Sequence, residues 1–292
     1  MTMSTNLDPT ASHLPKIPRE AVKDYRDNSE AMLEDVNEKL SSRDNIADLI
    51  GDNSLATMFD NHDNHVQFMA NSFELSDYEL LIRTISWVYR TYHNHGFSYD
   101  YFPIELEAWL DAVNEHLRAQ NAKPIEEVYS FMLENHREFV DMAQSLDKPQ
   151  FDIPDKWEEP VEELLSSLLD GDPQRSISVA DETVKSQKDV ENFFEYVVRP
   201  AMYRVGDKWQ EGEISVAEEH LASSTVSRVI STLYSRFVSF EENKGNAVVT
   251  AVANEFHEIG SRIVADSLEL DGWEQADEQQ VVDGVPGALA AW

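Results

Sequence analysis

Helical periodicity dominates this sequence and constrains its fold more than any other feature. Between residues 20 and 240, apolar residues recur three and four positions apart, as on the buried face of an amphipathic helix. Residues 247–253 break this period with a continuous, β-branched run that is typical of a buried parallel strand. We therefore expect a mainly α protein whose last segment opens a truncated α/β, Rossmann-like domain.

Proline-bearing and polar breaks divide the helical pattern into blocks. Residues 1–20 contain prolines without apolar periodicity and predict a disordered tail. Residues 21–150 predict one helical domain, which a linker at 151–158 separates from the next block. Residues 159–241 contain four helical segments with short connections, as in a four-helix bundle. Residues 245–292 are too few for a complete α/β domain.

Composition excludes several classes of function. There are 56 acidic residues and 23 basic ones, a net charge of −33, which repels phosphate backbones and argues against DNA binding. The sequence has no cysteine, so disulfides, thiolate metal sites, cysteine nucleophiles and cysteine-linked chromophores are excluded. Neither a signal peptide nor a long apolar run is apparent. We expect a cytoplasmic protein without a membrane partner.

Three side chains that could cap a ligand flank the break between the third and fourth expected bundle helices. Trp209 ends one helix, and Glu219 and His220 lie in the opening turns of the next. A loop that turns back would bring the indole, the carboxylate and the imidazole to one end of the bundle. A polar helix face with a structural tryptophan would have the same residues, and this pattern alone leaves both interpretations open.

The helix that carries Glu219 and His220 has two further features. Ser215 and Glu218 have the spacing of a capping box at its start. Small hydroxyl residues continue behind His220, namely Ser224, Ser227 and Ser231. Such a stripe would let a flat, bulky group approach the helix backbone.

A second candidate site follows the strand-like run, where α/β domains bind ligands. His257 lies in this position and could coordinate a metal, with Glu255 holding its second ring nitrogen. Gly260 would let a bulky ligand lie close to the start of the next helix. A solvent-facing histidine in a turn is the ordinary alternative.

Together the two sites resemble the cobalamin-binding module of the light-responsive CarH-type regulators, over roughly residues 159–273. The resemblance rests on Trp-x9-Glu-His followed by Glu-x-His-x-x-Gly. It implies that His257 is the lower axial ligand of cobalt. It also implies that Trp209, Glu219 and His220 cap the upper face, where the 5′-deoxyadenosyl group of adenosylcobalamin sits. Glu255 agrees with the photoreceptor branch, because methyl-carrying corrinoid proteins more often have Asp there.

The sequence departs from the family after His257. Complete modules have a later Ser-x-Leu and a later Gly-Gly motif, which line the pocket of the nucleotide tail, and neither follows here. An incomplete sheet also leaves the strand with an unpaired edge. We therefore expect either a shortened module with reduced cobalamin affinity, or a second subunit or homo-oligomer that completes the fold.

Aromatic and histidine residues are concentrated at 86–109, where core packing is the ordinary interpretation. A helix that ends in His93-x-x-Gly96-Phe97, followed by a short turn and an aromatic helix start, loosely resembles the F–G region of sensor globins, over about residues 25–143. Aligning Gly96-Phe97 with the Gly-Leu of that family puts Tyr92 at the position of the haem-ligating histidine. Globin-like domains joined to cobalamin modules occur in photocobilins, where the first domain holds a bilin. The resemblance implies biliverdin or another bilin, held without a covalent bond because cysteine is absent.

Chemical type suggests which side chains would hold the bilin. Aromatic residues would contact its rings, arginines its propionates and histidines its pyrrole nitrogens; the candidates are Arg83, Trp87, Arg90, His93, His95, Tyr99, Tyr101 and Phe102. His62 and His65 have helical i, i+3 spacing, which can serve zinc. They could also face the same pocket as the bilin contacts. With no third ligand evident, we expect them on a solvated face.

The leading hypothesis is a cobalamin-dependent photoreceptor, a sensor rather than an enzyme, that acts on an unidentified signalling partner. A corrinoid carrier in methyl transfer would share the bundle and His257 but would need an open upper face. A degenerate adaptor that binds no cobalamin would also fit the incomplete sheet. A haem-sensing globin is the remaining alternative.

Overall fold

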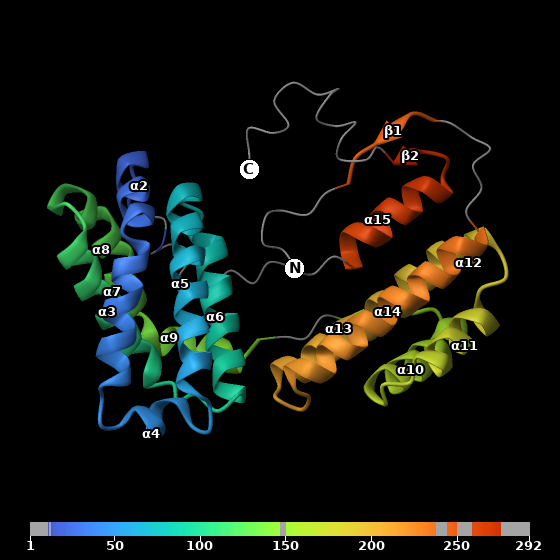
Figure 1. Cartoon of the computed structure of the whole chain (residues 1–292), viewed down its shortest axis with the longest axis horizontal. Helices are drawn as coiled ribbons and strands as arrows, with labels where there is room; N and C mark the ends of the chain where they lie inside the picture. Colours follow the sequence, from blue (N-terminus) through green and yellow to red (C-terminus); the bar gives the residue numbers. More distant parts are fainter. Residues whose placement is uncertain (1–10, 12, 147–149, 238–243, 250–258, 276–292) are drawn as a thin grey trace. The chain divides into compact units, whose positions relative to one another are not determined.

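The computed structural model describes residues 11, 13–146, 150–237, 244–249 and 259–275 (Figure 1). The chain forms two compact units, the first comprising Met1–Asp147 with Gln210–Gly212 and the second Lys148–Trp209 with Glu213–Trp292. Both are mainly helical, which confirms the expected fold class at that level. Within the described ranges, no helix has the length and apolar composition that crossing a membrane requires.

The first unit contains eight consecutive described helices. Two of them start with a side-chain cap, because Ser54 accepts a hydrogen bond from the Thr57 amide and Asp77 from the Leu80 amide. The helices are α2 (Arg19–Asp27), α3 (Ser29–Ser41), α4 (Ile46–Ile50), α5 (Leu55–Leu75), α6 (Tyr78–Asn94), α7 (Tyr101–His116), α8 (Ala119–Glu134) and α9 (His136–Gln144).

The core of the first unit is unusually aromatic. Helix α7 packs against both α3 and α8, and α5 packs against α2 and α3. Trp109, Tyr101, Tyr129 and Tyr25 are among its largest fully buried side chains. Each brings a polar group into an apolar interior, where it needs a hydrogen-bond partner. A globin-like arrangement of these helices stays a prediction.

The described end of the N-terminal segment packs onto this core. Ile17 is only 4% exposed, and its amide donates to the Ser76 hydroxyl at 3.2 Å. The Tyr78 hydroxyl donates to the Pro15 carbonyl. Burial of Ile17 and these two bonds hold residues just before α2, so the disordered tail expected over residues 1–20 does not extend to them.

The second unit begins with a helical bundle. One long helical stretch in it changes from α to π geometry and back, and Pro200, which has no backbone N–H, lies just after the π segment. The elements of the bundle are α10 (Asp155–Leu169), α11 (Pro173–Thr183), α12 (Gln187–Phe193), η1 (Phe194–Val198), α13 (Arg199–Gln210) and α14 (Val216–Phe237).

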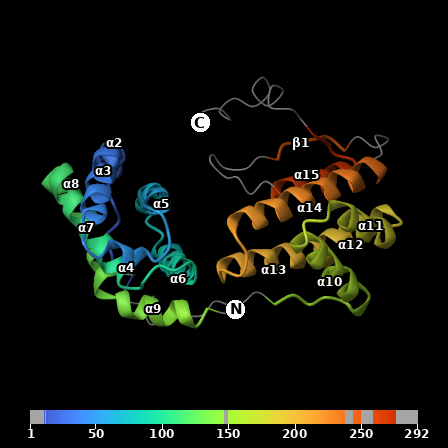
Figure 2. The same ribbon diagram turned by 60° about the horizontal axis from the view of Figure 1, so that its bottom comes forward.

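The bundle is held by the apolar faces of its helices. Leu164 and Leu168 on α10 and Val226, Val229 and Leu233 on α14 are buried in one core. Helix α14 packs against α10 and α11, and the π segment η1 packs against α10 (Figure 2). The 3.6-residue period read from the sequence therefore corresponds to a real buried stripe.

A short α/β segment follows the bundle. Strand β1 (Asn246–Ala247) pairs in parallel with β2 (Glu274–Gln275), and α15 (Ile259–Leu270) lies between them in the sequence. Helix α15 packs on α14, with Leu270 in the bundle core. With two described residues in each strand, a Rossmann-like segment stays a prediction.

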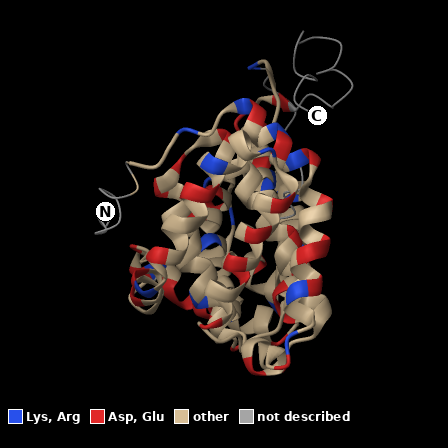
Figure 3. Ribbon diagram, turned by 90° about the vertical axis from the view of Figure 1, so that its left-hand side faces the viewer, with Lys and Arg blue, Asp and Glu red and all other residues tan. Residues whose placement is uncertain are grey.

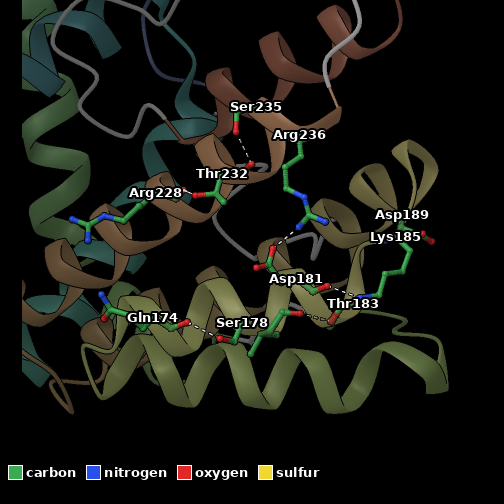
Figure 4. A network of polar contacts seen from close by, with 11 residues as sticks. Gln174, Ser178, Asp181, Thr183, Lys185, Asp189, Arg228, Thr232, Ser235 and Arg236 are labelled. Carbon is green, nitrogen blue, oxygen red and sulfur yellow. Dashed lines mark hydrogen bonds and ion pairs between the residues drawn. The ribbon is translucent and has the colours of Figure 1, made fainter.

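Polar contacts on the bundle surface are mostly local. Figure 4 shows hydroxyl groups bonded to the backbone of their own helix, such as Ser178 to the Gln174 carbonyl at 3.0 Å and Thr232 to the Arg228 carbonyl at 2.9 Å. The ion pair between Arg236 and Asp181 joins α14 to α11. Exposed pairs of this kind contribute little stability.

Acidic side chains are spread over many helices rather than collected in one segment, as the first unit illustrates (Figure 3). With 56 acidic and 23 basic residues, most carboxylates have no cation available. Such a surface is well solvated, and its carboxylates repel one another. Dissolved salt screens this repulsion.

Candidate functional site

One end of the bundle carries the Trp-x9-Glu-His residues. Trp209 lies at the end of α13, and residues 211–215 connect it to α14, whose first turns carry Glu219 and His220. Figures 1 and 2 show that this connection joins α13 and α14 at one end of the bundle. The three side chains thus belong to the same end of the second unit.

Helix α14 starts with the expected capping box. The Ser215 amide donates to Glu218 Oε2 at 2.7 Å, and the Glu218 amide donates to Ser215 Oγ at 3.3 Å. The hydrogen bond from the Ser215 amide is the largest influence on the Glu218 carboxyl and lowers its pKa. These bonds satisfy amide groups that a helix start leaves open, and so they fix where α14 begins.

The next carboxylate, Glu219, is held by two donors. Its Oε2 lies 2.7 Å from Nδ1 of His220, and its Oε1 accepts from the Ser223 hydroxyl at 2.7 Å. The Glu219 side chain is 17% exposed, whereas that of His220 is 73% exposed. A carboxylate oxygen only accepts in this contact, so Nδ1 donates to Glu219 and Nε2 takes no part in it. The pair therefore presents a fixed carboxylate and an imidazole open to a ligand.

Small side chains continue from Glu219 along α14. The Ser227 hydroxyl donates to the Ser223 carbonyl at 3.0 Å, and the Ser231 hydroxyl donates to the Ser227 carbonyl at 2.8 Å. Arg262 of α15 donates to Ser231 Oγ at 2.7 Å. The hydroxyl protons of Ser227 and Ser231 are thus bonded within their own helix, and the stripe meets α15 at Ser231. Ser224, which the sequence placed in this stripe, is exposed.

The second predicted site is described only at its last residue. Glu255 and His257 lie outside the described residues. Gly260 is in the first turn of α15, and a Cβ added there would meet no atom of the described residues within 4 Å. No described side chain therefore crowds this turn, as expected if a bulky group lies near the helix start.

Hydrogen bonds hold α15 on the bundle. The Tyr234 hydroxyl of α14 donates to the Glu269 carboxylate, and the Gln187 amide donates to the Leu270 carbonyl. Burial and the hydrogen bond to Glu269 raise the pKa of Tyr234 to about 12. These contacts position α15, and with it Gly260, relative to α14.

Residues 160–234 match a family model described as a B12 binding domain. The matched range spans α10 to α14, including Trp209, Glu219 and His220. Neither the comparison with curated proteins nor that with solved structures gives a match. This part of the chain is similar to B12-binding domains. The match supports cobalamin as the cofactor, which agrees with the cobalamin predicted from the sequence.

The described residues fit a large, flat cofactor of this kind. The side chains of Ser223, Ser227 and Ser231 along α14 are small, and no described atom lies within 4 Å of a Cβ added at Gly260. His220 offers an exposed imidazole, and Glu219 a carboxylate that two donors already orient.

The predicted bilin contacts divide into two groups in the first unit. Arg83 pairs with Glu79 at 2.9 Å on an exposed surface, and Trp87 is 41% exposed one turn further along α6. Arg90 is half-buried and donates to the Leu146 carbonyl at 2.7 Å. This first group faces outward along α6.

The second group lies around the α6–α7 turn and in the core. The exposed His93 ring stacks on the Tyr99 ring at 4.0 Å, and His95 is half-buried. Tyr101 and Phe102 are fully buried, facing the core. The structure therefore does not gather the eight candidates on one surface.

A buried polar cluster in the same core was missed from the sequence. His62, expected on a solvated face, is completely buried, and the His65 side chain is only 16% exposed. That expectation was wrong because α5 turns this face toward α7. No group of three potential metal ligands occurs among the described residues. His65 contacts Glu105 and Tyr129, and both are far from His65 in the sequence. The i, i+3 spacing of the two histidines was therefore the only sequence signal of this cluster.

Proposed function

We propose that the protein is a cobalamin-dependent photoreceptor that passes a light signal to a partner protein. Adenosylcobalamin would lie between the helix bundle and the C-terminal α/β segment. The observation that carries this proposal is the Ser223–Glu219–His220 contact within the matched B12-binding range. An oriented carboxylate and imidazole suit the polar sugar of an adenosyl group, whereas a methyl carrier needs an open upper face.

Each residue of the site has a distinct role in this proposal. Trp209 covers the upper group, and Glu219 and His220 offer it hydrogen bonds. The resemblance to the light-responsive regulators assigns His257 as the axial ligand, with Glu255 holding its second nitrogen. Gly260 leaves room for the ring. When bound, adenosylcobalamin supplies a cobalt–carbon bond that light can break.

The first unit would hold a bilin in a globin-like fold. Support comes from the helix order, in which the short α4 precedes the long α5. Because the chain has no cysteine, the bilin would be held without a covalent bond. Tyr92, at the position of the haem-ligating histidine, packs its ring on Phe97 at 5.3 Å, and burial raises the pKa of its hydroxyl. A neutral phenol packed in this way favours a bilin over haem.

The cobalamin part is tested with purified full-length protein. We expect protein incubated with adenosylcobalamin in the dark to retain the corrinoid through gel filtration, and green light to change its visible spectrum. The His257→Ala variant should lose retention, while His13→Ala, which removes an exposed histidine of the N-terminal segment, should not. An unchanged spectrum with retained corrinoid contradicts the photoreceptor, and protein that retains no corrinoid contradicts cobalamin binding.

The bilin part needs a separate measurement. Full-length protein produced in cells supplied with biliverdin should carry a visible band at long wavelength that denaturation releases, because no covalent bond can form. A Soret band instead would indicate haem. Colourless protein would remove the bilin while leaving the cobalamin part of the proposal unaffected.

A further inference from the structure

Helices α14 and α15 meet through polar side chains in the second unit. Arg262 of α15 donates from Nη2 to Ser231 Oγ at 2.7 Å, and the Tyr234 hydroxyl of α14 donates to the Glu269 carboxylate. Residue numbers rise along both helices from the first pair to the second, so the two helices run in the same sense (Figure 1). The first turn of α15, which contains Arg262, therefore points toward the half of α14 that begins near Glu219.

Two hydrogen bonds in series orient the Arg262 guanidinium. Ser231 gives its own hydroxyl proton to the Ser227 carbonyl at 2.8 Å, so its oxygen is left to accept from Arg262. The Asp266 carboxylate lies 3.9 Å from Arg262 Nε, which is beyond hydrogen-bond distance. The Arg262 side chain is 42% exposed, and a guanidinium has five N–H donors. Donors of Arg262 are therefore left for a ligand on its open side.

A second arginine lies one turn before Ser231 on α14. Arg228 precedes Ser231 by three positions, and residues three apart on a helix share one surface, with Cβ atoms about 5–6 Å apart. Its side chain is exposed and makes no ion pair or hydrogen bond within the described part of the chain. In Figure 4 only the Arg228 backbone carbonyl takes part in a contact, with Thr232. Arg228 and Arg262 thus flank Ser231 from two helices.

An arginine without a carboxylate partner is unusual in this chain. With 56 acidic and 23 basic residues, carboxylates outnumber cations more than two to one. Other arginines of the bundle pair with a carboxylate, namely Arg175 with Asp170, Arg199 with Glu195, Arg204 with Glu162 and Arg236 with Asp181. Among the described residues, by contrast, nothing competes with a ligand for the Arg228 guanidinium.

The chemistry of a guanidinium indicates what this pair of arginines would bind. Guanidinium groups donate to oxygen acceptors, most strongly to anionic ones such as phosphate. A corrinoid has two kinds of oxygen at its rim, the carbonyls of the amide side chains around the corrin ring and the phosphodiester of the nucleotide tail. A chain of net charge −33 repels the anionic phosphodiester unless cations face it locally. Arg228 and Arg262 supply two such cations.

We propose that Arg228 and Arg262 bind the rim of the corrinoid by donating hydrogen bonds to its amide or phosphodiester oxygens. The inference rests on the proposed function, because it takes the corrinoid to lie between α14 and the C-terminal α/β segment. Twelve residues separate Glu219 from Ser231, about 18 Å along the helix axis, so the contact with the upper group and the contact with the rim are distinct. Both arginines are positioning residues that set affinity and take no part in breaking the cobalt–carbon bond.

The affinity of full-length protein for two corrinoids, measured by equilibrium dialysis in the dark, tests the inference. The Kd for adenosylcobalamin should rise about tenfold in Arg228→Gln and in Arg262→Gln, as expected for the loss of one charge-assisted hydrogen bond. Adenosylcobinamide, which lacks the nucleotide tail, distinguishes the two kinds of oxygen. A loss confined to adenosylcobalamin assigns the phosphodiester, and an equal loss for both corrinoids assigns the ring amides.

The matched control is Arg236→Gln, which removes an arginine of the same helix that pairs with Asp181 and should keep the wild-type Kd. Arg228→Gln should leave the thermal unfolding of cofactor-free protein unchanged, so this variant keeps the test valid if Arg262→Gln loosens α15. Wild-type affinity in both Arg228→Gln and Arg262→Gln, or an equal loss in the control, overturns the inference while leaving cobalamin binding intact. Wild-type protein that binds neither corrinoid overturns the proposed function and the inference with it.

Discussion

The two units use the same pair of side chains in opposite ways. In the first, His65 and Glu105 are 3.6 Å apart with side chains 16% and 7% exposed, so both are enclosed by the core. In the second, His220 and Glu219 are 2.7 Å apart, and the imidazole is 73% exposed. An enclosed pair can exchange protons only with its neighbours, whereas an open imidazole is available to a ligand. Burial, rather than residue type, separates the two roles.

The energetic consequences differ as well. Enclosing His65 and Glu105 shifts both pKa values, because desolvation disfavours the charged form of each. Such a cluster is expensive to bury and is maintained by mutual hydrogen bonds. In the Glu219–His220 pair, the imidazole of His220 keeps its contact with water, so this pair costs the fold little. Four substitutions test this contrast.

The largest effect is expected from Trp109→Ala in the closed core. Removing a fully buried indole should lower the free energy of unfolding of the first unit by about 3–5 kcal/mol, through lost apolar burial and a cavity. Denaturant unfolding followed by circular dichroism measures this. The control is Trp87→Ala, which removes a tryptophan that is 41% exposed and should cost far less. If both variants lost the same free energy of unfolding, Trp109 would not be buried in a solvent-excluded core.

Glu105→Gln should change how stability depends on pH. The folded pKa of about 7 lies above the unfolded value of 4.5, so the folded state binds this proton more tightly. The contribution of this proton to the free energy of unfolding is fully present below pH 4.5. It is lost as pH rises through 7, and the total loss is about 3 kcal/mol. Relative to wild type, Glu105→Gln should therefore gain stability from pH 4.5 to 7. Denaturant unfolding at several pH values measures the difference, with the exposed Glu107→Gln on the same helix as control. A difference in stability between variant and wild type that does not change with pH would indicate that Glu105 is exposed to solvent.

A smaller effect is expected from Ser215→Ala at the start of α14. Losing the cap should destabilise the second unit by about 1 kcal/mol. Thermal unfolding measures this, and Ser224→Ala, which removes an exposed serine of the same helix, is the control. Because the cap positions the turns that carry Glu219 and His220, corrinoid retention should also fall in Ser215→Ala. Unchanged stability would mean that α14 does not begin at this cap.

The smallest effect on stability is expected from His220→Ala. An exposed imidazole contributes within about 0.5 kcal/mol, so unfolding should be nearly unchanged. Adenosylcobalamin retention in the dark should nevertheless decrease, as measured by gel filtration and visible absorption. The matched enclosed change, His65→Ala, should do the reverse and destabilise the first unit without affecting retention. If both variants behave alike, the contrast between open and closed pairs is wrong.

Local patterns in the sequence predicted a large part of the fold. The apolar period predicted the helices of both units, and Ser215 with Glu218 predicted the cap of α14, whose hydrogen bonds confirm it. The motif around Trp209 predicted a B12-binding module, and the family match over residues 160–234 supports that assignment. These features depend on residues close together in the chain, which is why sequence reasoning reaches them.

The cluster around His65 depends on contacts between distant positions. His65 and Tyr129 are 64 residues apart in the sequence, and Tyr25 and Tyr129 are 104 apart. Helical spacing showed that His62 and His65 share a face of α5 but could not show which neighbour covers it. For the same reason, chemical type grouped Trp87 with Tyr101, although one side chain is exposed and the other buried.

The sequence by itself determined the helical period, the acidic surface, the absence of cysteine chemistry and the local signature of a cobalamin module. The tertiary structure alone decided which polar side chains face the core and which face water. The physical reason is that periodicity and capping act within a few residues of the chain. Desolvation, by contrast, is set by every element that packs on a side chain, and it separates His65 from His220.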